Sequence, residues 1–501
     1  MGLRSLTLID VLRRNAALYP DRTAFVFGAE RTTHAEYLRQ IERLAAALAG
    51  LGIGAGDRIV VLSNNNPEFV ALYGAAAWLG AILTPINWRL GTEEIAYIVG
   101  DAAPKIVIAD QVNQDVFRTA RPEFSGVERF VGVDGGAAPF QPLAPLVAAA
   151  GAAPPPHGEA GPFVMIHTAA VAGRPRGALL SQAGLLANAL QAIAGWSLIE
   201  RDVAYLALPL FHVAGLNLLL SALCAGAASV VVPRFDPKQA AQAIAAEQAT
   251  VFAGFAPMLG TLLDAAGGGA PLASLRTVTG LDTPETITRF ETLCPGARFY
   301  VAFGQTETSG FVTMAPFRER PGSAGRPMVL SSVAVVDEGD CPVAVGEIGE
   351  IVVRGPGVFE QYWNRPDDTA ATFRNGWHHT GDLGAFDADG YLWYRGRSAA
   401  KELIKPGGEN VYPAEVEAAL KAHPAVAEAV VFGVSDKEWG EAVKAVCVLR
   451  RGGVANAQEL IDFVAGRIAR YKRPKHLVIA ADLPRRDDGA IDRARTRDLH
   501  G

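Results

Sequence analysis

The 501-residue sequence predicts an α/β fold, with a large N-terminal domain of layered parallel or mixed sheets and helices and a small, mobile α+β C-terminal domain. Three observations predict it. The chain exceeds the length at which a single hydrophobic core stops growing, so two or more domains are expected. Strand-like runs alternate with helical patterns, which is typical of parallel sheets covered by helices on both faces. Half of the residues are hydrophobic and a fifth are charged, as in ordinary globular proteins.

The N-terminal elements follow regular sequence signals. A capping-box spacing from Thr33 to Glu36 predicts the start of an amphipathic helix, because apolar residues then recur every three or four positions. Residues 58–63 and 105–109 are strand-like runs, and Pro67 begins a helix between them. Strands that alternate with helices in this way predict a parallel sheet.

Residues 213–232 form an uncharged stretch long enough to cross a bilayer. The character of this stretch changes midway, since residues 216–224 have a helical pattern whereas residues 229–232 are mostly β-branched and stop at Pro233. We therefore predict a buried helix followed by a buried strand rather than a membrane span. Upstream, the Pro-rich residues 152–162 predict a surface linker that is not helical.

Charge and cysteine content narrow the function classes. The formal net charge of -6 argues against a nucleic-acid or other polyanionic partner. The charged N-terminus lacks the apolar core of a signal peptide, and the cysteines show neither a CxxC spacing nor a histidine cluster. These features predict a cytoplasmic protein without a disulfide framework or a zinc site. The scattered cysteines are Cys224, Cys294, Cys341 and Cys447.

One stretch near residue 300 carries the clearest chemical signal. Residues 299–303 are apolar and aromatic and predict a buried strand that ends at Gly304, where a glycine lets the backbone approach a ligand. Thr306 and Glu307 follow directly. A hydroxyl and a carboxylate just past a strand end suit phosphate oxygens and Mg²⁺. A simple polar turn is the alternative interpretation of this stretch taken alone.

Residues 303–307, FGQTE, resemble the Tyr-Gly-x-Thr-Glu signature of the adenylate-forming enzymes, which include acyl-CoA synthetases, luciferases and peptide-synthetase adenylation domains. Similar matches follow in the family's order from near the N-terminus to the C-terminus. This resemblance implies that Phe303 stacks on adenine, Thr306 contacts phosphate and Glu307 binds Mg²⁺. Gly304 is implied to lie in the same nucleotide site.

The loop that begins at Thr168 resembles the family's ATP phosphate loop only at its end. Gly173, Arg176 and Gly177 match, with Arg176 in place of the usual Lys. Before them, residues 169–172 hold Ala and Val where the family has Ser, Thr and Gly, and only Thr168 keeps a hydroxyl. Backbone amides can still form a phosphate-binding nest. Two interpretations stay open, a modified ATP loop and a relict loop.

Other segments resemble the family's acyl and ribose sites. Residues 208–215 match a segment whose His lies where the acyl pocket meets the pantetheine tunnel, which implies that place for His212. Gly280 stands, in a weaker match, where the family has a turn against adenine and the acyl group. Asp382, in a Thr-Gly-Asp-Leu segment, and Arg397 are implied to bind the ribose, because a carboxylate that accepts two hydrogen bonds recognises vicinal hydroxyls well.

Residues 401–413 resemble the family's hinge and the glycine loop that follows it. The resemblance implies that the small domain swings here between an adenylating pose and a thioester-forming pose. The hinge is expected at 397–401, with Lys401 as its pivot. Gly407 and Gly408 are implied to lie against the pantetheine arm of CoA, since glycines permit close backbone approach.

Ala490 stands where the family pattern places a catalytic Lys directly after a glycine, here Gly489. In the family, the ammonium group of that Lys bridges the substrate carboxylate and ATP during adenylation. Two explanations stay open, an engineered Lys→Ala substitution and a natural loss that accompanies the altered phosphate loop.

The sequence thus predicts an ATP- and acyl-binding domain at 1–396, a hinge at 397–401 and a mobile C-terminal domain at 402–501. The resemblance implies an AMP-forming acyl-CoA synthetase, most like those for fatty or medium-chain acids, that uses ATP, Mg²⁺ and CoA with a small-molecule carboxylate. The chain as given is expected to be impaired in adenylation. The alternatives are an adenylation-deficient relative that binds nucleotide or acyl-CoA, and an enzyme that loads a carrier protein. A homodimer also stays open.

Overall fold

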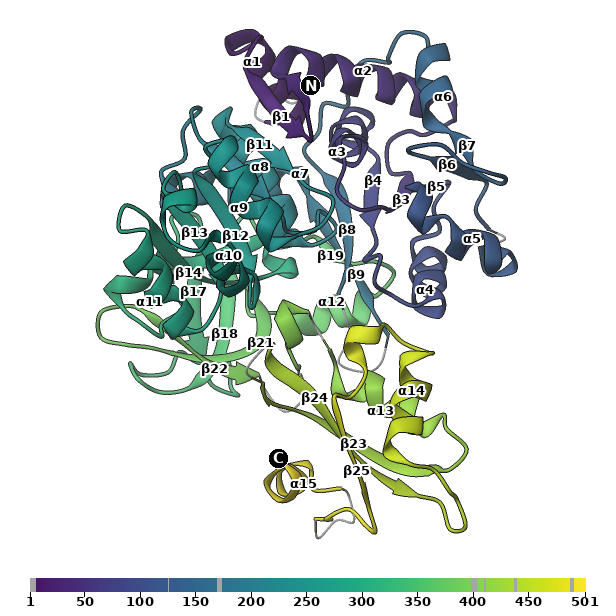
Figure 1. Ribbon diagram of the computed structural model, residues 1–501, viewed down its shortest axis with the longest axis vertical. Coiled ribbons are helices and arrows are strands. Elements are labelled where there is room, and N and C mark those ends of the chain that lie inside the picture. Colours follow the sequence, from purple (N-terminus) through teal and green to yellow (C-terminus); the bar gives the residue numbers. More distant parts are fainter. Residues whose placement is uncertain are drawn as a thin grey trace.

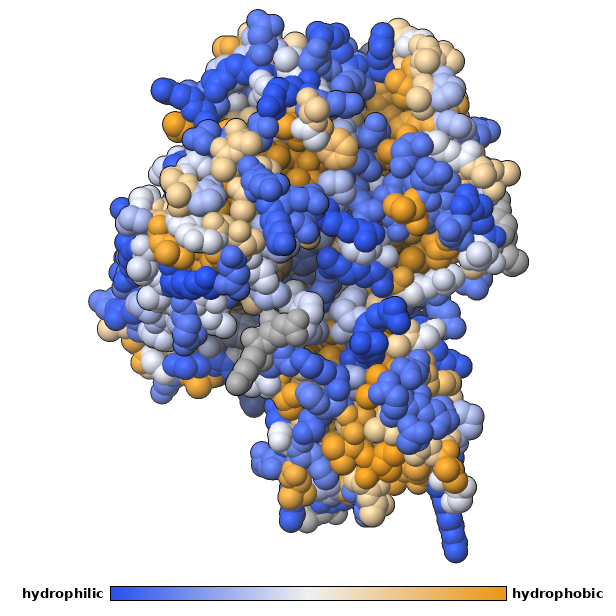
Figure 2. All heavy atoms as spheres, in the orientation of Figure 1, coloured by the Kyte–Doolittle hydropathy of each residue, from blue (hydrophilic) through white to orange (hydrophobic). Residues whose placement is uncertain are grey.

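The computed structural model describes residues 6–124, 126–168, 174–397, 403–409, 411–436, 439–486 and 491–501. A large body of sheets and helices carries a small domain that projects below it (Figure 1), and the space-filling view has the same outline (Figure 2). Three sheets belong to the large body and one to the small domain. This arrangement confirms the predicted α/β fold class, with a large N-terminal domain and a smaller C-terminal domain.

An eight-stranded sheet forms one half of the large body. Its strands, in order across the sheet, are β19 (Gln361–Tyr362), β9 (Arg176–Ser181), β8 (Pro162–Thr168), β4 (Ile82–Pro85), β3 (Arg58–Leu62), β5 (Ile106–Ala109), β6 (Arg129–Gly132) and β7 (Gln141–Pro142). From β8 to β7 all neighbours pair in parallel, as the alternating sequence pattern predicts. The antiparallel pairs of β9 with β8 and β19 make the sheet mixed.

A nine-stranded sheet forms the other half. Its order is β16 (Arg326–Pro327), β15 (Gly310–Pro316), β14 (Arg298–Gln305), β13 (Thr277–Leu281), β12 (Val251–Phe255), β10 (Val203–Leu206), β11 (Ala228–Val231), β1 (Thr23–Phe27) and β2 (Glu30–Thr33). The strands from β14 to β1 pair in parallel, so their carboxyl ends share one edge. In open α/β sheets, ligands bind outside that edge.

A third, antiparallel sheet lies beside β14 and completes the large body. Its strands are β17 (Ser332–Val336), β18 (Gly349–Arg354), β20 (Phe373–Arg374), β21 (Trp377–Phe386) and β22 (Leu392–Arg397). One hydrophobic cluster joins this sheet to β14 and β15. It contains Phe303 of β14, Val312 of β15 and four residues of the third sheet, namely Val335, Ile351, Val353 and Leu392. The cluster fixes the third sheet against the end of the nine-stranded sheet, and this brings distant sequence motifs together.

Helices cover the sheets and fill the space between them. In the large body they are α1 (Leu8–Leu18), α2 (His34–Gly50), α3 (Pro67–Leu79), α4 (Thr92–Ala102), α5 (Asp115–Thr119), α6 (Leu143–Ala149), α7 (Gln182–Trp196), α8 (Val213–Ala225), α9 (Pro237–Ala246), α10 (Met258–Ala266), α11 (Pro284–Leu293) and α12 (Pro366–Thr372). The largest hydrophobic core draws residues from α3, α7 and α8 and from both large sheets. Across the described part of the chain, we find no helix with the length and apolar character that a bilayer span requires.

Several sequence predictions are confirmed. A capping box links Thr33 and Glu36 at the start of α2, and Asn66 caps the helix that Pro67 begins. The uncharged stretch 213–232 forms α8 and then β11, with α8 almost wholly buried. One prediction is wrong: β14 does not end at Gly304 but runs on to Gln305. The strand continues because it pairs with β15 as far as the turn that reverses the chain.

The small domain is built on a three-stranded sheet of β23 (Val426–Asp436), β24 (Gly440–Leu449) and β25 (His476–Ala480), with helices α13 (Pro413–Lys421), α14 (Ala457–Ala465) and α15 (Arg493–His500). A buried ion triad docks it onto the large body. Lys472 Nζ lies 2.5 Å from Glu94 Oε1 on α4 and 2.6 Å from Glu415 Oε1 on α13. Burial lowers the pKa of Lys472, but the two carboxylates more than offset this and raise it, so the ammonium stays charged.

Gly280, near the carboxyl end of β13, is a position that only glycine fits. Its φ is +139°, and a Cβ there would lie 1.7 Å from the carbonyl oxygen of Gly254 on β12. The two residues are direct partners in the parallel register. The close contact therefore lies within the nine-stranded sheet, at the edge where ligands are expected.

We predict that Gly280→Ala lowers the free energy of unfolding by at least about 2 kcal/mol, because it combines a strained φ with a backbone clash. Gly296→Ala is the matched control, since that site has no positive φ and no atom within 4 Å of a Cβ. Thermal denaturation of both variants and the parent measures the effect. Equal melting temperatures for the two variants would contradict the prediction.

Candidate active site

A cavity of about 140 Å³ opens at the carboxyl ends of β12, β13 and β14. Residues of the large body and of the small domain line it together. Eight of the predicted site residues are among them, namely Thr168, Arg176, His212, Gly280, Gly304, Thr306, Glu307 and Arg397. The structure thus brings together motifs that lie more than two hundred residues apart in the sequence.

Glu307 is the centre of a buried hydroxyl cluster in the cavity wall. It lies in η4 (Thr306–Thr308), directly after β14. Glu307 Oε1 accepts hydrogen bonds from Thr168 Oγ1, at 3.1 Å, and from Tyr362 Oη, at 2.8 Å. Burial and then the charge of Glu307 raise the pKa of Tyr362, so its hydroxyl keeps the proton that it donates. The carboxylate is therefore fixed from two sides.

Arg176 places a positive charge beside this cluster. Its guanidinium carbon lies 4.0 Å from the centre of the Tyr362 ring, and Nη2 lies 3.3 Å from Tyr362 Oη. Asp368 lies 3.6 Å from Nη1. Arg176 Nε is buried and has no hydrogen-bond acceptor within the described residues. A buried donor without an acceptor is unusual, and Arg176 is one of the residues that line the cavity.

Asp382 and Arg397 form a buried ion pair at the end of β21 and β22. Arg397 Nε lies 2.8 Å from Asp382 Oδ1. Tyr394 Oη donates to the same oxygen at 3.2 Å, and Gln305 Nε2 donates to Oδ2 at 3.2 Å. Burial lowers the pKa of Arg397, but Asp382 together with Tyr412, Tyr394 and Glu307 more than offsets this, and the net shift is upward. The Arg397 guanidinium therefore stays charged.

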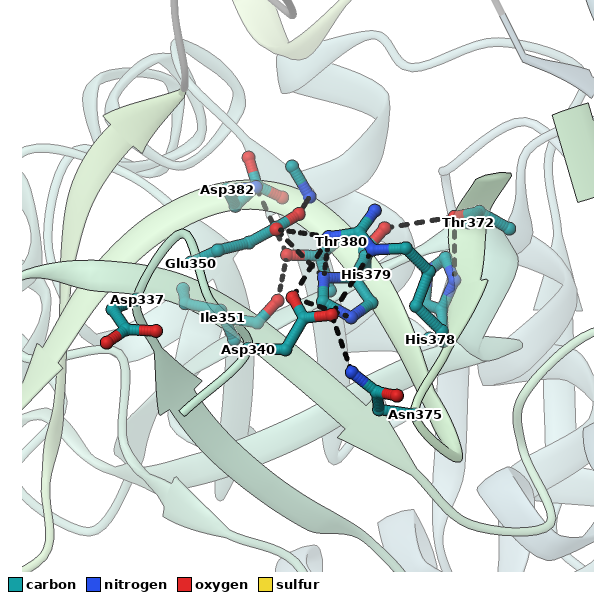
Figure 3. A network of polar contacts seen from close by, with 12 residues as sticks. Asp337, Asp340, Glu350, Ile351, Thr372, Asn375, His378, His379, Thr380 and Asp382 are labelled. Atoms are coloured by element: carbon teal, nitrogen blue, oxygen red, sulfur yellow. Dashed lines mark hydrogen bonds and ion pairs between the residues drawn. The ribbon is translucent and has the colours of Figure 1, made fainter. Parts of the chain in front are cut away.

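A polar network around Glu350 holds Asp382 in place (Figure 3). Glu350 Oε1 accepts from the backbone N–H of Gly381 at 2.8 Å, and Oε2 lies 2.9 Å from His379 Nδ1. The hydroxyl of Thr380 accepts from the backbone N–H of Asp382 at 3.1 Å. Gly381 has φ +72°, a left-handed conformation that a glycine adopts at low cost. The Thr-Gly-Asp segment is thus shaped by its neighbours before any ligand binds.

His212 lies on the apolar side of the cavity. Its Nδ1 caps α8 by accepting from the backbone N–H of Ala214 at 3.2 Å, and its ring meets Phe255 edge to face, with centroids 6.0 Å apart. Burial lowers the pKa of His212 to about 4, and the charges of Lys405 and Arg89 add to the effect. The ring is therefore neutral at physiological pH.

The small domain contributes Lys405 and Tyr412 to the cavity wall. Between them, Gly407 has φ +57°, and its backbone N–H donates to the carbonyl of Trp439 at 3.0 Å. A Cβ at Gly407 would lie 3.5 Å from the carbonyl oxygen of Ala256, which follows β12. The glycine loop of the small domain therefore reaches the strand edge of the large body.

The other predicted site residues lie elsewhere. Gly177 is within β9, Gly408 ends the short helix η7 (Pro406–Gly408), and Phe303 is buried with its ring 6.1 Å from that of Tyr394. Gly173, Lys401 and Ala490 lie outside the described residues.

Sequence reasoning missed the other lining residues of this site, and four of them are Gln305, Tyr362, Lys405 and Tyr412. Three of them had a signal, because Gln305 lies inside the FGQTE motif and Lys405 and Tyr412 flank the glycine loop. Tyr362 had none, since no recognised motif contains it.

Comparison with known proteins agrees with this geometry. Residues 12–363 match the family described as AMP-binding enzyme, and residues 415–489 match the AMP-binding enzyme C-terminal domain. The chain is 36% identical to an indoleacetate–CoA ligase of Aromatoleum aromaticum, over 99% of this chain and 98% of that protein. It is 33% identical to a feruloyl-CoA synthase of an Amycolatopsis species, over 97% and 98% of the two chains.

Solved structures give the same answer. A putative long-chain-fatty-acid CoA ligase of Rhodopseudomonas palustris is 53% identical, covers 79% of this chain and all of its own, and superposes with a TM-score of 0.76. An o-succinylbenzoate CoA synthetase of Bacillus subtilis is 28% identical, covers 97% of this chain and 98% of its own, and has a TM-score of 0.87. With a family match that spans well over half of its length, the chain belongs to the AMP-binding enzyme family and is similar to CoA ligases throughout.

Proposed function

We propose that this protein is an ATP-dependent acid–thiol ligase that makes a CoA thioester from a ring-bearing carboxylic acid. In the first step the carboxylate attacks the α-phosphate of ATP, which forms acyl-AMP and releases pyrophosphate. In the second step the CoA thiolate attacks the acyl carbon and AMP leaves. The single observation that carries the proposal is the cavity, in which the Glu307 cluster, the Asp382–Arg397 pair and an apolar wall meet.

The polar wall suits the nucleotide. Asp382 and Arg397 are proposed to bind the ribose hydroxyls, since a fixed carboxylate accepts from both. Phe303, whose ring is buried near that pair, is proposed to face adenine. Thr306 and Arg176 are proposed to contact the phosphates, because the buried Arg176 Nε has no acceptor of its own. With the nucleotide held in this way, the protein contributes position and charge rather than covalent chemistry.

Glu307 fits a Mg²⁺ ion in its donor chemistry. Mg²⁺ takes oxygen ligands and is often held by one carboxylate together with substrate phosphates. No cluster of three His, Cys, Asp or Glu side chains that could hold a metal occurs in the described ranges, so a protein-only metal cage is absent from them. When bound, the ion would neutralise phosphate charge. Glu307 and the nearby hydroxyls of Thr168 and Thr306 would hold it.

The apolar wall suits the acid. Neutral His212 and Gly280 are proposed to border the acyl group, because neither adds a charge that would repel or trap a carboxylate. The sequence resemblance implied fatty or medium-chain acids, and one similar structure is titled a putative long-chain-fatty-acid CoA ligase. Relatives named for indoleacetate, feruloyl and 2-succinylbenzoate groups favour a ring-bearing acid.

The docked small domain suits the thioester step. Gly407 and Gly408 are proposed to border the pantetheine arm, because their loop reaches the cavity edge. The described residues on either side of position 490 form an antiparallel β-bridge between Arg485 and Ile491. Helix α15 follows directly and lies at the end of the small domain that is remote from the large body (Figure 1). Adenylation is therefore proposed to need a swing of residues 402–501 about a hinge at 397–401, pivoting at Lys401.

An adenylation-deficient relative is the second candidate. The observation that favours it is Ala490, which stands where a Lys is expected. Such a protein would still bind nucleotide and would accept preformed acyl-AMP.

Nucleotide binding and turnover together test the proposed function. We predict pyrophosphate release and CoA-thioester formation with part of a carboxylate panel, and AMP binding that Asp382→Ala weakens by about 1.5–3 kcal/mol, the range for charged hydrogen bonds. Asp389→Ala is the control, because that exposed carboxylate pairs with Arg320 at the β21–β22 turn. Calorimetry measures binding and a coupled pyrophosphate assay measures turnover. If neither ATP nor AMP bound at millimolar concentration, the ligase proposal would fail.

Position 490 separates the two half-reactions. An ammonium aimed at developing charge is worth about 3–4 kcal/mol, or 10²–10³-fold in rate, by analogy with one oxyanion-hole donor. We predict that Ala490→Lys raises the acyl-adenylation rate by that order, while the rate from supplied acyl-AMP and CoA changes little. Single-turnover assays of each half-reaction measure the two rates. Equal adenylation rates in both proteins would show that residue 490 is not the missing lysine.

The neutral state of His212 predicts a pH effect on stability. Its pKa falls from an ordinary 6.5 to about 4 on folding, so between these values the folded protein binds fewer protons than the unfolded chain. The stability contributed by the neutral ring is present above pH 6.5 and is lost as the pH falls toward 4. His212→Asn keeps a capping acceptor for α8 and removes the titration. We predict that the variant loses about 1–3 kcal/mol less stability than the parent over this interval. Melting temperatures of the parent and the variant, measured from pH 6.5 to pH 4, test this prediction. If the two curves of melting temperature against pH are parallel, the prediction is wrong.

A further inference from the structure

Asn217 is a fully buried amide in the wall of the acyl side of the cavity. It lies on α8, five residues after His212, and its exposed fraction is 0%. At the α-helical rise this places it about 7.5 Å further along the helix axis than His212. Asn217 is therefore more than one turn further along α8 than His212, and both residues line the cavity.

The contacts of the neighbouring Asn188 determine which side-chain atom of Asn217 is the nitrogen and which is the oxygen. Asn188 Nδ2 donates to the backbone carbonyls of Thr308, at 3.3 Å, and Phe311, at 2.8 Å. Its Oδ1 is therefore an acceptor, and it lies 2.6 Å from Asn217 Nδ2. A flipped Asn217 would bring two carbonyl oxygens into contact, so the assignment holds without knowing any hydrogen position.

The remaining atom, Asn217 Oδ1, has no donor among the described residues. Buried amide oxygens without a partner are rare in folded proteins, because burial removes the hydrogen bonds that water would supply. Asn217 is at the same time a lining residue of the cavity. A ligand in the cavity is therefore the natural source of the missing donor.

The small and aromatic residues that line the cavity favour a flat ring. Gly280, Ala302 and Gly310 line the cavity with little or no side chain, and Phe311 and Phe255 line it with aromatic rings. A Cβ at Gly310 would lie 2.6 Å from Asn188 Oδ1, so this part of the wall has no room for a side chain. Backbone walls and ring edges suit a planar group better than a branched one.

We propose that Asn217 Oδ1 accepts a hydrogen bond from an N–H or O–H group at the end of the acid remote from its carboxylate. The substrate class is thus a ring-bearing acid with a polar donor, and Asn217 is the residue that selects it. The inference rests on the proposed ligase function and deepens it. An unsubstituted acyl chain has no donor and leaves the buried oxygen unpaired, so the site disfavours it.

Isosteric acid pairs test this with the unmodified protein. Indole-3-acetate is compared with benzofuran-3-acetate, which replaces N–H by oxygen, and 4-hydroxyphenylacetate with 4-methylphenylacetate. We expect the donor-bearing member of at least one pair to have a kcat/KM about tenfold higher or more, the size of one net hydrogen bond. A preference in the indole pair indicates an N–H donor, and a preference in the phenol pair indicates an O–H donor. Ratios near one in both pairs would overturn the inference and would indicate that water satisfies the oxygen.

Variants locate the effect. Asn217→Leu is expected to reduce the ratio to near one. Ser221→Ala, one turn further along α8, is expected to keep it, because the Ser221 hydroxyl donates to the backbone carbonyl of Asn217. If Asn217→Leu does not fold, the acid pairs still decide through the unmodified protein. Dissociation constants for the same acids, measured by calorimetry, give the ratio without turnover. Thus a protein that forms no thioester but prefers donor-bearing acids fails the ligase proposal alone, and one that forms thioesters without preference fails the Asn217 inference alone.

Discussion

The geometry of the site depends on the buried ion pair between Asp382 and Arg397. The pair joins β21 to β22, and Gln305 at the end of β14 donates to the same carboxylate. Arg397 Nη1 also lies 3.5 Å from the hydroxyl of Tyr412 in the small domain. Removing one partner of a buried pair costs about 3–5 kcal/mol, since the other charge is left without compensation. This ion pair therefore contacts the third sheet, the nine-stranded sheet and the small domain, and it lies beside the cavity.

A second buried charge decides where the small domain sits. Lys472 is held between Glu94 of the large body and Glu415 of its own domain. A buried ammonium is tolerated only with such partners, so the docked position is specific rather than a loose hydrophobic contact. The backbone N–H of Ala469 donates to Glu94 as well, at 3.0 Å. This docking carries the glycine loop to the cavity, where the thioester step is proposed to take place.

Close backbone contacts shape the cavity edge at Gly280 and Gly304. A Cβ at Gly304 would lie 2.0 Å from the carbonyl oxygen of Gly310, just as one at Gly280 would meet Gly254. These contacts keep strands close together where they reach the cavity. Closely packed interiors transmit such constraints without relaxing. The buried Asn188–Asn217 pair lies beside Gly310, and the proposed selection of an acid by polarity rests on it.

Local sequence determined the elements and most of the motifs, because capping, periodicity and glycine chemistry act over a few residues. The helix that begins after Thr33 and the helix–strand pair in 213–232 are of this kind. Tertiary structure decided the rest. The end of β14 depends on its pairing with β15, and Tyr362 joins Thr168 and Glu307 only because β19 pairs with β9. Such contacts link residues far apart in the chain, and no local propensity encodes them, since they arise from the packing of whole sheets.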